Sequence, residues 1–98
     1  MARRWIVRAT AETDLGEAAR WYDDRQTGLG FRFLDAVDTL LARIYVAPLQ
    51  FPIVSGDVRR ALLQAFPYAV YFRATDDAVI VFAVLHLRRN PRTWRARS

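Results

Sequence analysis

The 98-residue sequence contains no cysteine, and it has only one histidine and two serines. The lack of cysteine excludes disulfides and thiolate chemistry. A zinc site would need several carboxylates beside His86, but most acidic residues fall between positions 12 and 38, far from His86 in the sequence. Ser55 and Ser98 offer little basis for a Ser-His-Asp arrangement. We therefore expect no metal, no cofactor and no conventional hydrolase.

Long hydrophobic runs are also missing. The most apolar run, Ala78 to Leu87, has about half the length that spans a bilayer. The apolar stretch behind the basic N-terminus, Trp5 to Val7, is too short for the hydrophobic region of a signal peptide. We expect a cytoplasmic protein that makes no membrane contact.

Lysine is absent too, so all fifteen basic residues are arginine, and the formal net charge is +5. Residues 11–57 carry eight acids against four arginines, whereas residues 58–98 carry eight arginines against Asp76 and Asp77. A compositional bias would explain the choice of arginine over lysine, but not this clustering. Arginine suits bidentate contact with phosphate or carboxylate groups. The second half of the chain is therefore expected to contact another macromolecule.

The spacing of apolar residues predicts a single α+β domain, 1–98, with the element order β-α-α-β-β-β. We expect a strand over residues 4–8, a helix capped by Thr10, and a second helix that ends at Pro48. Gly28-Leu29-Gly30 separates the helices, which should form a hairpin packed on one face of a small antiparallel sheet. The remaining strands are expected over three ranges, 58–64, 68–73 and 79–87.

The last eleven residues, 88–98, form a basic C-terminal tail with five arginines, no acid and one tryptophan, Trp94. Charge combined with an aromatic surface is typical of a nucleic-acid contact. It also suits an acidic protein partner. A frayed, solvated terminus is the third interpretation, although a tryptophan would then be left unused.

His86, the single histidine, could act as a general base. It ends the last predicted strand beside Arg88 and Arg89, where neutral imidazole and guanidinium groups would suit phosphodiester chemistry. Arg59 and Arg60 are adjacent in a strand, so only one of them can join any single site. The simpler interpretation is that His86 is a polar residue closing the strand.

Several motifs occur in an order and spacing that resemble the RelE/ParE superfamily of toxin–antitoxin toxins. The likeness spans roughly residues 3–97, and no single motif in it is very specific. The motifs are Asp14-Leu15-x-Glu17-Ala18-x-x-Trp21-Tyr22, Gly28-Leu29-Gly30-x-x-Phe33-Leu34, Pro48…Phe51-Pro52, Arg59-Arg60-Ala61-Leu62-Leu63…Phe66-Pro67-Tyr68-x-Val70-Tyr71-Phe72 and His86-x-Arg88-Arg89-x-Pro91-x-x-Trp94.

The resemblance implies a helical hairpin on an antiparallel sheet and a cognate antitoxin whose C-terminal segment folds along the toxin. RelE-like members cleave mRNA in the ribosomal A site, using basic residues on the sheet and an aromatic residue or histidine near the C-terminus. ParE-like members, associated with plasmid stabilization and growth arrest, poison DNA gyrase and lack that catalytic set.

This sequence is more similar to the ParE-like branch. Tyr68 stands where RelE-like members typically carry arginine, and no tyrosine occurs near Trp94. The leading interpretation is a toxin that inhibits DNA gyrase by binding and is neutralised by its antitoxin, with no catalytic residues. We expect six residues to contact the target: His86, Arg88, Arg89, Arg92, Trp94 and Arg95.

Two alternatives stay open. A ribosome-dependent mRNA endonuclease would use four residues, Arg59, Arg60, His86 and Arg89. An inactive module that only binds an antitoxin would need none of them.

Overall fold

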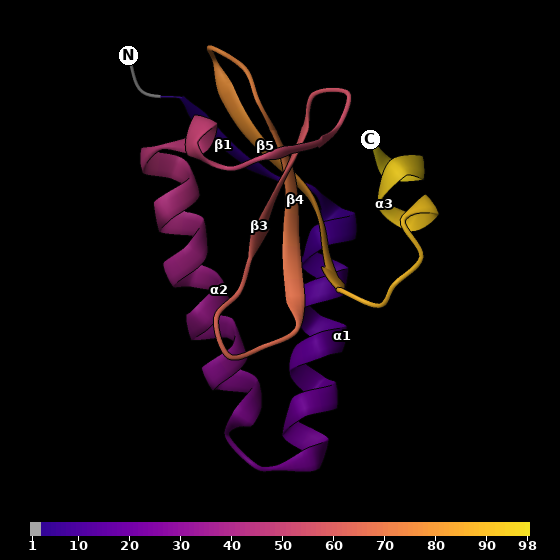
Figure 1. Cartoon of the computed structure of the whole chain (residues 1–98). Coiled ribbons are helices and arrows are strands. Elements are labelled where there is room, and N and C mark those ends of the chain that lie inside the picture. The colour runs from indigo at the N-terminus through magenta and orange to yellow at the C-terminus, as the bar shows by residue number, and fades with distance from the viewer. Residues whose placement is uncertain (1–2) are drawn as a thin grey trace.

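The computed structural model describes residues 3–98. Its elements follow the chain in the order shown in Figure 1. They are β1 (Arg4–Val7), α1 (Ala9–Arg25), α2 (Leu29–Val46), a 3-10 turn η1 (Pro48–Gln50), β2 (Ile53–Ser55), β3 (Val58–Leu62), β4 (Tyr68–Ala74), β5 (Ala78–His86) and α3 (Arg92–Arg97). The predicted α+β fold is confirmed, and β2 and α3 are added to it.

The five strands form one sheet in the order β1-β5-β4-β3-β2. The pairs from β5 to β2 are antiparallel, as expected, but β1 runs parallel to β5, with Arg4 opposite Ala78. The long apolar strand β5 therefore lies inside the sheet, next to the first strand of the chain. A bulge leaves Phe82 without a partner on β4, between Val81 and Ala83. Side chains on both faces of β5 are buried.

The two long helices form an antiparallel hairpin that covers one face of the sheet (Figure 1). Gly28 adopts a left-handed φ of 88°, which glycine tolerates without steric cost. Gly30 has no room for a side chain, because a Cβ atom there would lie 2.5 Å from the carbonyl oxygen of Ala19. The Asp23 carboxylate accepts hydrogen bonds from the amides of both glycines, at 3.1 and 2.9 Å. The expected glycine turn is thus held by an aspartate in the preceding helix.

The start of α1 differs from the prediction. The helix begins at Ala9, one residue before Thr10, and the Thr10 hydroxyl donates to the carbonyl oxygen of Phe82 on β5 at 2.9 Å instead of capping α1. The Thr10 hydroxyl, which the local sequence predicted to cap the helix, therefore bonds a strand that is distant in the sequence.

Two apolar clusters occupy the two faces of the sheet. The larger one lies between the sheet and the hairpin, around Phe33 and Phe72. The smaller one lies on the opposite face, where Tyr71 and Phe82 pack with Trp94 of α3. The C-terminal tail is therefore folded back on the sheet. No helix within residues 3–98 is long and apolar enough to cross a membrane.

Candidate functional site

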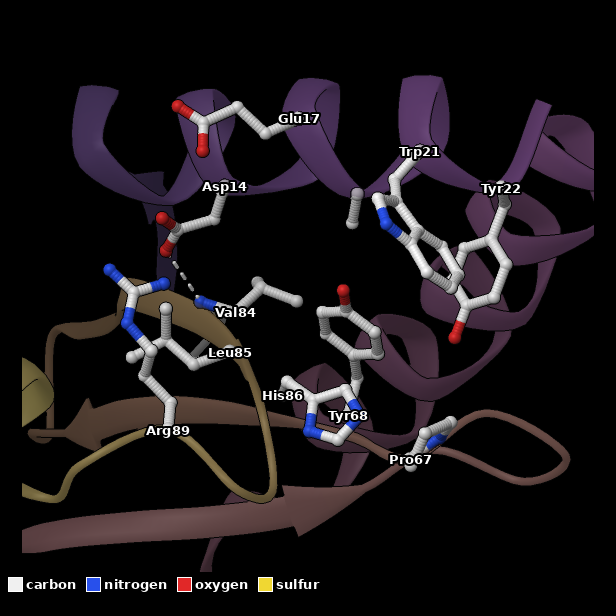
Figure 2. Close-up of a pocket in the computed structure, with 11 residues that line it drawn as sticks. Asp14, Glu17, Trp21, Tyr22, Pro67, Tyr68, Val84, Leu85, His86 and Arg89 are labelled. Atoms are coloured by element: carbon white, nitrogen blue, oxygen red, sulfur yellow. Dashed lines mark hydrogen bonds between the residues drawn. The ribbon is translucent and has the colours of Figure 1, made fainter. Parts of the chain in front are cut away.

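A groove of about 510 Å³ opens between α1 and the C-terminal end of β5 (Figure 2). It is lined by eleven residues from α1, the start of β4 with the residue before it, β5 and the segment after β5: Asp14, Glu17, Ala18, Trp21, Tyr22, Pro67, Tyr68, Val84, Leu85, His86 and Arg89. Two of the residues that the sequence singled out, His86 and Arg89, lie in this groove.

One face of α1 forms the first wall, because residues four apart on a helix lie above one another. Thr10 and Asp14 both reach β5, where Thr10 bonds Phe82 and the Asp14 Oδ2 atom accepts from the amide of Val84 at 2.9 Å. The strand β1 has already ended at Val7, so these side chains bond the edge of β5 where a longer β1 would have continued.

Asp14 also binds the C-terminal helix. The guanidinium of Arg97 donates to Oδ2 at 2.5 Å and to Oδ1 at 3.1 Å, in a bidentate pair that joins residues 83 positions apart. The Asp14 side chain is only 7% exposed, so the carboxylate depends on these three donors for its solvation. The one sequence signal for this role was the place of Asp14 inside the apolar stripe of the helix, three residues after Ala11 and four before Ala18.

Aromatic rings form the opposite end of the groove. The ring of Tyr68 lies 5.3 Å from that of His86 and 6.0 Å from that of Tyr22. Trp21 stands at the rim, half exposed, with the guanidinium of Arg25 4.0 Å from its ring. The pKa of the Tyr68 hydroxyl is raised, mainly because the hydroxyl is partly buried. The positive charge of Arg89 lowers this pKa, and the negative charge of Asp14 raises it, but burial has the larger effect. The hydroxyl is therefore neutral at physiological pH and can donate a hydrogen bond.

The histidine ring has a defined tautomer when it is neutral. Its Nδ1 atom accepts a hydrogen bond from the backbone amide of Arg88 at 3.0 Å, so the proton is on Nε2. This contact fixes the ring at the mouth of the groove, beside Tyr68.

The tail residues predicted to contact a target separate into two kinds. Arg88, Arg89, Arg92 and Arg95 are exposed. Trp94 is not: it is 5% exposed, and its ring stacks on that of Tyr71 with centroids 4.8 Å apart. The interpretation of Trp94 as an open stacking surface is therefore wrong for this conformation, because its ring anchors α3 to the sheet.

The residues considered for a nuclease site are not brought together. His86 pairs with Tyr68 on the hairpin-covered face of the sheet, whereas Arg60 pairs with Tyr71 on the opposite face. Arg59 lies on the hairpin side, but its guanidinium donates to the carbonyl oxygens of Phe51 and Leu49, at 2.7 and 3.4 Å. Of the four residues, only His86 and Arg89 share the groove.

The chain is similar to known proteins both in sequence and in fold. A family model described as the ParE toxin of the type II toxin–antitoxin system parDE matches residues 6–91. The protein called Toxin ParE2 from two strains of Mycobacterium tuberculosis is 35% identical over 97 residues, which cover 98% of this chain and 92% of the relative. A structure of the chromosomal ParDE system from P. aeruginosa has the same fold, with a TM-score of 0.78 and 13% identity, covering 87% of this chain and 96% of that one.

Proposed function

The chain belongs to the ParE toxin family of type II toxin–antitoxin systems, and from that premise we propose that it arrests growth by binding DNA gyrase and that a cognate antitoxin neutralises it. Membership of this family implies an antitoxin partner. Beyond this membership, we propose three points: that gyrase is the target, which surface binds it, and that the antitoxin neutralises the toxin.

The observation that carries the proposal is the dispersal of the basic residues that a nuclease would use. A catalyst of phosphodiester cleavage needs its base and its charge-stabilising groups around one reacting phosphate. Arg60 faces away from His86, and the guanidinium of Arg59 is already bonded to two carbonyl groups. A toxin that acts by binding has no such requirement.

The surface that we assign to the target is the exposed basic group beyond β5. It consists of Arg88, Arg89, Arg92 and Arg95, with the half-buried His86 at the end of β5 beside them and the buried Trp94 packed on the sheet. No acid occurs after Asp77, so a negatively charged surface of a DNA-bound enzyme would meet little repulsion there.

A supercoiling assay tests this proposal. Purified toxin at micromolar concentration should inhibit gyrase supercoiling, and equimolar antitoxin should restore it. A variant with Arg89 and Arg92 changed to alanine should inhibit far less. The variant with Arg20 and Arg32 changed to alanine removes the same charge from exposed positions of the hairpin that do not line the groove, so it is the matched control and should inhibit normally. Unaffected supercoiling at this concentration would refute the gyrase target.

One observation favours the ribosome-dependent endonuclease as a second candidate. His86, Tyr68 and Arg89 line the same groove, where an imidazole and a neutral phenol could exchange protons beside one guanidinium. In that case His86→Ala would remove toxicity and leave the fold intact, and a translation assay run on the same preparation would show arrest. If His86→Ala remains toxic, the endonuclease is excluded. If the wild type itself does not arrest growth, the protein is an inactive module that only binds an antitoxin.

A further inference from the structure

The open face of the sheet, which is the face opposite the hairpin, gathers arginine side chains from three strands. Successive side chains of a strand point to opposite faces. Val7 packs toward the hairpin, so Arg4, three positions earlier, lies on the open face. Arg60 lies there too, because it pairs with Tyr71, whose ring belongs to the apolar cluster of this face. Arg73 follows Tyr71 by two positions on β4 and shares its face.

The ends of this row lie beyond the strands. Arg8, directly after β1, lines a hollow of about 560 Å³ together with Ile80, a side chain of the open face. The helix α3 packs on the same face through Trp94. At about 100° per residue, Arg92 lies on the opposite side of α3 from Trp94, and Arg95 is exposed next to it. The arginines therefore extend from β1 to the outer surface of α3.

Most of these arginines have no acidic partner. In the part of the chain that the structure describes, two ion pairs form, Arg97 with Asp14 and Arg73 with Asp57. The second pair is 4.0 Å long and its Asp57 side chain is 79% exposed, so it neutralises little charge. No ion pair or side-chain hydrogen bond within residues 3–98 holds the guanidinium groups of five others: Arg4, Arg8, Arg60, Arg92 and Arg95.

The acids are concentrated on the other side of the sheet. Seven of the ten acidic residues lie in α1 and α2, which cover the opposite face. Near the open face, acids occur in the turns at its margin, as Asp57 between β2 and β3 and as Asp76 and Asp77 between β4 and β5. The domain therefore presents one positively charged face, which attracts a polyanion.

The side chains of the open face favour duplex nucleic acid over a protein or a single strand. A protein interface needs an apolar, aromatic centre, whereas interfaces with DNA are polar and strongly positive. Single strands stack their bases on exposed aromatic rings. Within residues 3–98, the exposed aromatic side chains all lie at the hairpin or pack against it: Trp5, Trp21, Phe31 and Tyr45. The rings of Tyr71 and Trp94 are on the open face, but they are buried against each other.

The width of the row matches a duplex. Arg8 follows β1 and Arg60 lies on β3, three strands away in the sheet. With neighbouring strands about 4.8 Å apart, their backbones are separated by about 14 Å. The major groove of B-DNA is about 12 Å wide. Arginines at the two ends of the row can thus contact phosphates on both sides of one groove.

We propose that the open face binds the phosphate backbone of duplex DNA without reading its sequence. Contacts to phosphate position a protein on DNA but carry no sequence information. The proposal rests on the gyrase target proposed above and adds to it the DNA that gyrase holds. Arg92 and Arg95 belong both to this face and to the basic group beyond β5, so DNA and enzyme are contacted side by side.

DNA binding is measured without gyrase, by the fluorescence anisotropy of a short labelled duplex of arbitrary sequence mixed with the full-length toxin. The affinity should fall steeply between about 50 and 200 mM salt, because each phosphate contact contributes about −0.9 to the slope of log K against log salt concentration. Arg8→Ala and Arg60→Ala should each weaken binding several-fold and make this slope less steep by about 0.9. Arg32→Ala removes the same charge from an exposed position of the hairpin, so it is the matched control and should leave the slope unchanged.

The supercoiling assay extends the test to the target. The variant with both Arg8 and Arg60 changed to alanine should inhibit gyrase several-fold less than the wild type, and Arg32→Ala should inhibit normally. Since the guanidinium groups of Arg8 and Arg60 are unbonded within the described residues, both variants should fold, and circular dichroism checks this. If Arg60→Ala does not fold, Arg8→Ala and Arg4→Ala carry the same test.

Each contrary outcome has its own meaning. Equal weakening of DNA binding by Arg32→Ala would show that net charge alone matters, and the open face would lose its assignment. Tighter binding of single-stranded RNA than of duplex DNA would overturn the duplex and support the endonuclease. Gyrase inhibition by a wild type that does not bind the duplex would refute the DNA contact and leave the gyrase target standing. Duplex binding without inhibition would support the DNA contact and refute the gyrase target.

Discussion

The pair formed by Asp14 and Arg97 is expected to hold the C-terminal helix on the domain. Arg97→Ala would leave the nearly buried Asp14 carboxylate with one donor, the amide of Val84. Breaking a fully buried pair by removing one partner costs about 3–5 kcal/mol, but the Arg97 side chain is 22% exposed and water can reach the vacated site. We therefore expect a loss of about 2 kcal/mol in the free energy of unfolding.

Asp14→Ala should cost a similar amount for a different reason. It leaves the amide of Val84 without its acceptor, a penalty of about 1–3 kcal/mol for a buried donor. In the double variant the guanidinium and the carboxylate are both gone, so the loss should be well below the sum of the two single losses. The expected coupling free energy is about 1–2 kcal/mol.

Urea unfolding of the four proteins measures this coupling. Tryptophan fluorescence is the natural signal, since Trp94 lies in the same helix as Arg97 and stacks on Tyr71. Arg92→Ala is the matched control: it is an exposed arginine of the same helix, and it should change stability by less than about 0.5 kcal/mol. Additive losses, within about 0.5 kcal/mol, would refute the idea that the pair acts as a unit.

Two further predictions concern aromatic residues. Trp94→Ala should lower the free energy of unfolding by about 3 kcal/mol, because it removes the largest side chain from the apolar cluster on the face of the sheet opposite the hairpin. Trp21 is half exposed, so Trp21→Ala should lower it by less than about 1 kcal/mol. Thermal unfolding of both variants compares them, and equal losses would contradict the packing role of Trp94. Burial raises the pKa of the Tyr68 hydroxyl above its ordinary value near 10, so its neutral form stabilises the fold at neutral pH and this contribution is lost as pH rises through the raised pKa. Burial also raises the pKa of Tyr22, so ultraviolet titration should show one late-ionising tyrosine fewer in Tyr68→Phe than in the wild type, and an unchanged number would contradict the burial of Tyr68.

Much of the fold could be predicted from local sequence patterns. The two helices follow from apolar residues at helical spacing, and the turn between them follows from Gly28, which occupies a conformation that other residues avoid. The three antiparallel strands follow from β-branched and aromatic runs bounded by turn residues. These features depend on neighbours within a few positions, and such neighbours are visible in the sequence.

The location of the groove was only partly predictable. The sequence indicated that His86 and Arg89 lie together, since they are three residues apart at the end of a strand. It could not show that Trp21 and Tyr68 face them, because this depends on how the hairpin packs across the sheet.

Tertiary structure alone decided the rest. The parallel pairing of β1 with β5 joins residues more than seventy positions apart, and no local pattern encodes such a partner. The same pairing ends early, and beyond it the side chains of Thr10 and Asp14 bond the edge of β5, although the local sequence predicted that Thr10 caps the helix. Trp94 was predicted to offer a stacking surface to a target together with the arginines of the tail, yet its ring is buried against Tyr71 on a distant strand. Sequence determined which elements form, through short-range sterics and hydrophobic spacing; long-range contacts determined how these elements pack and which side chains line the groove.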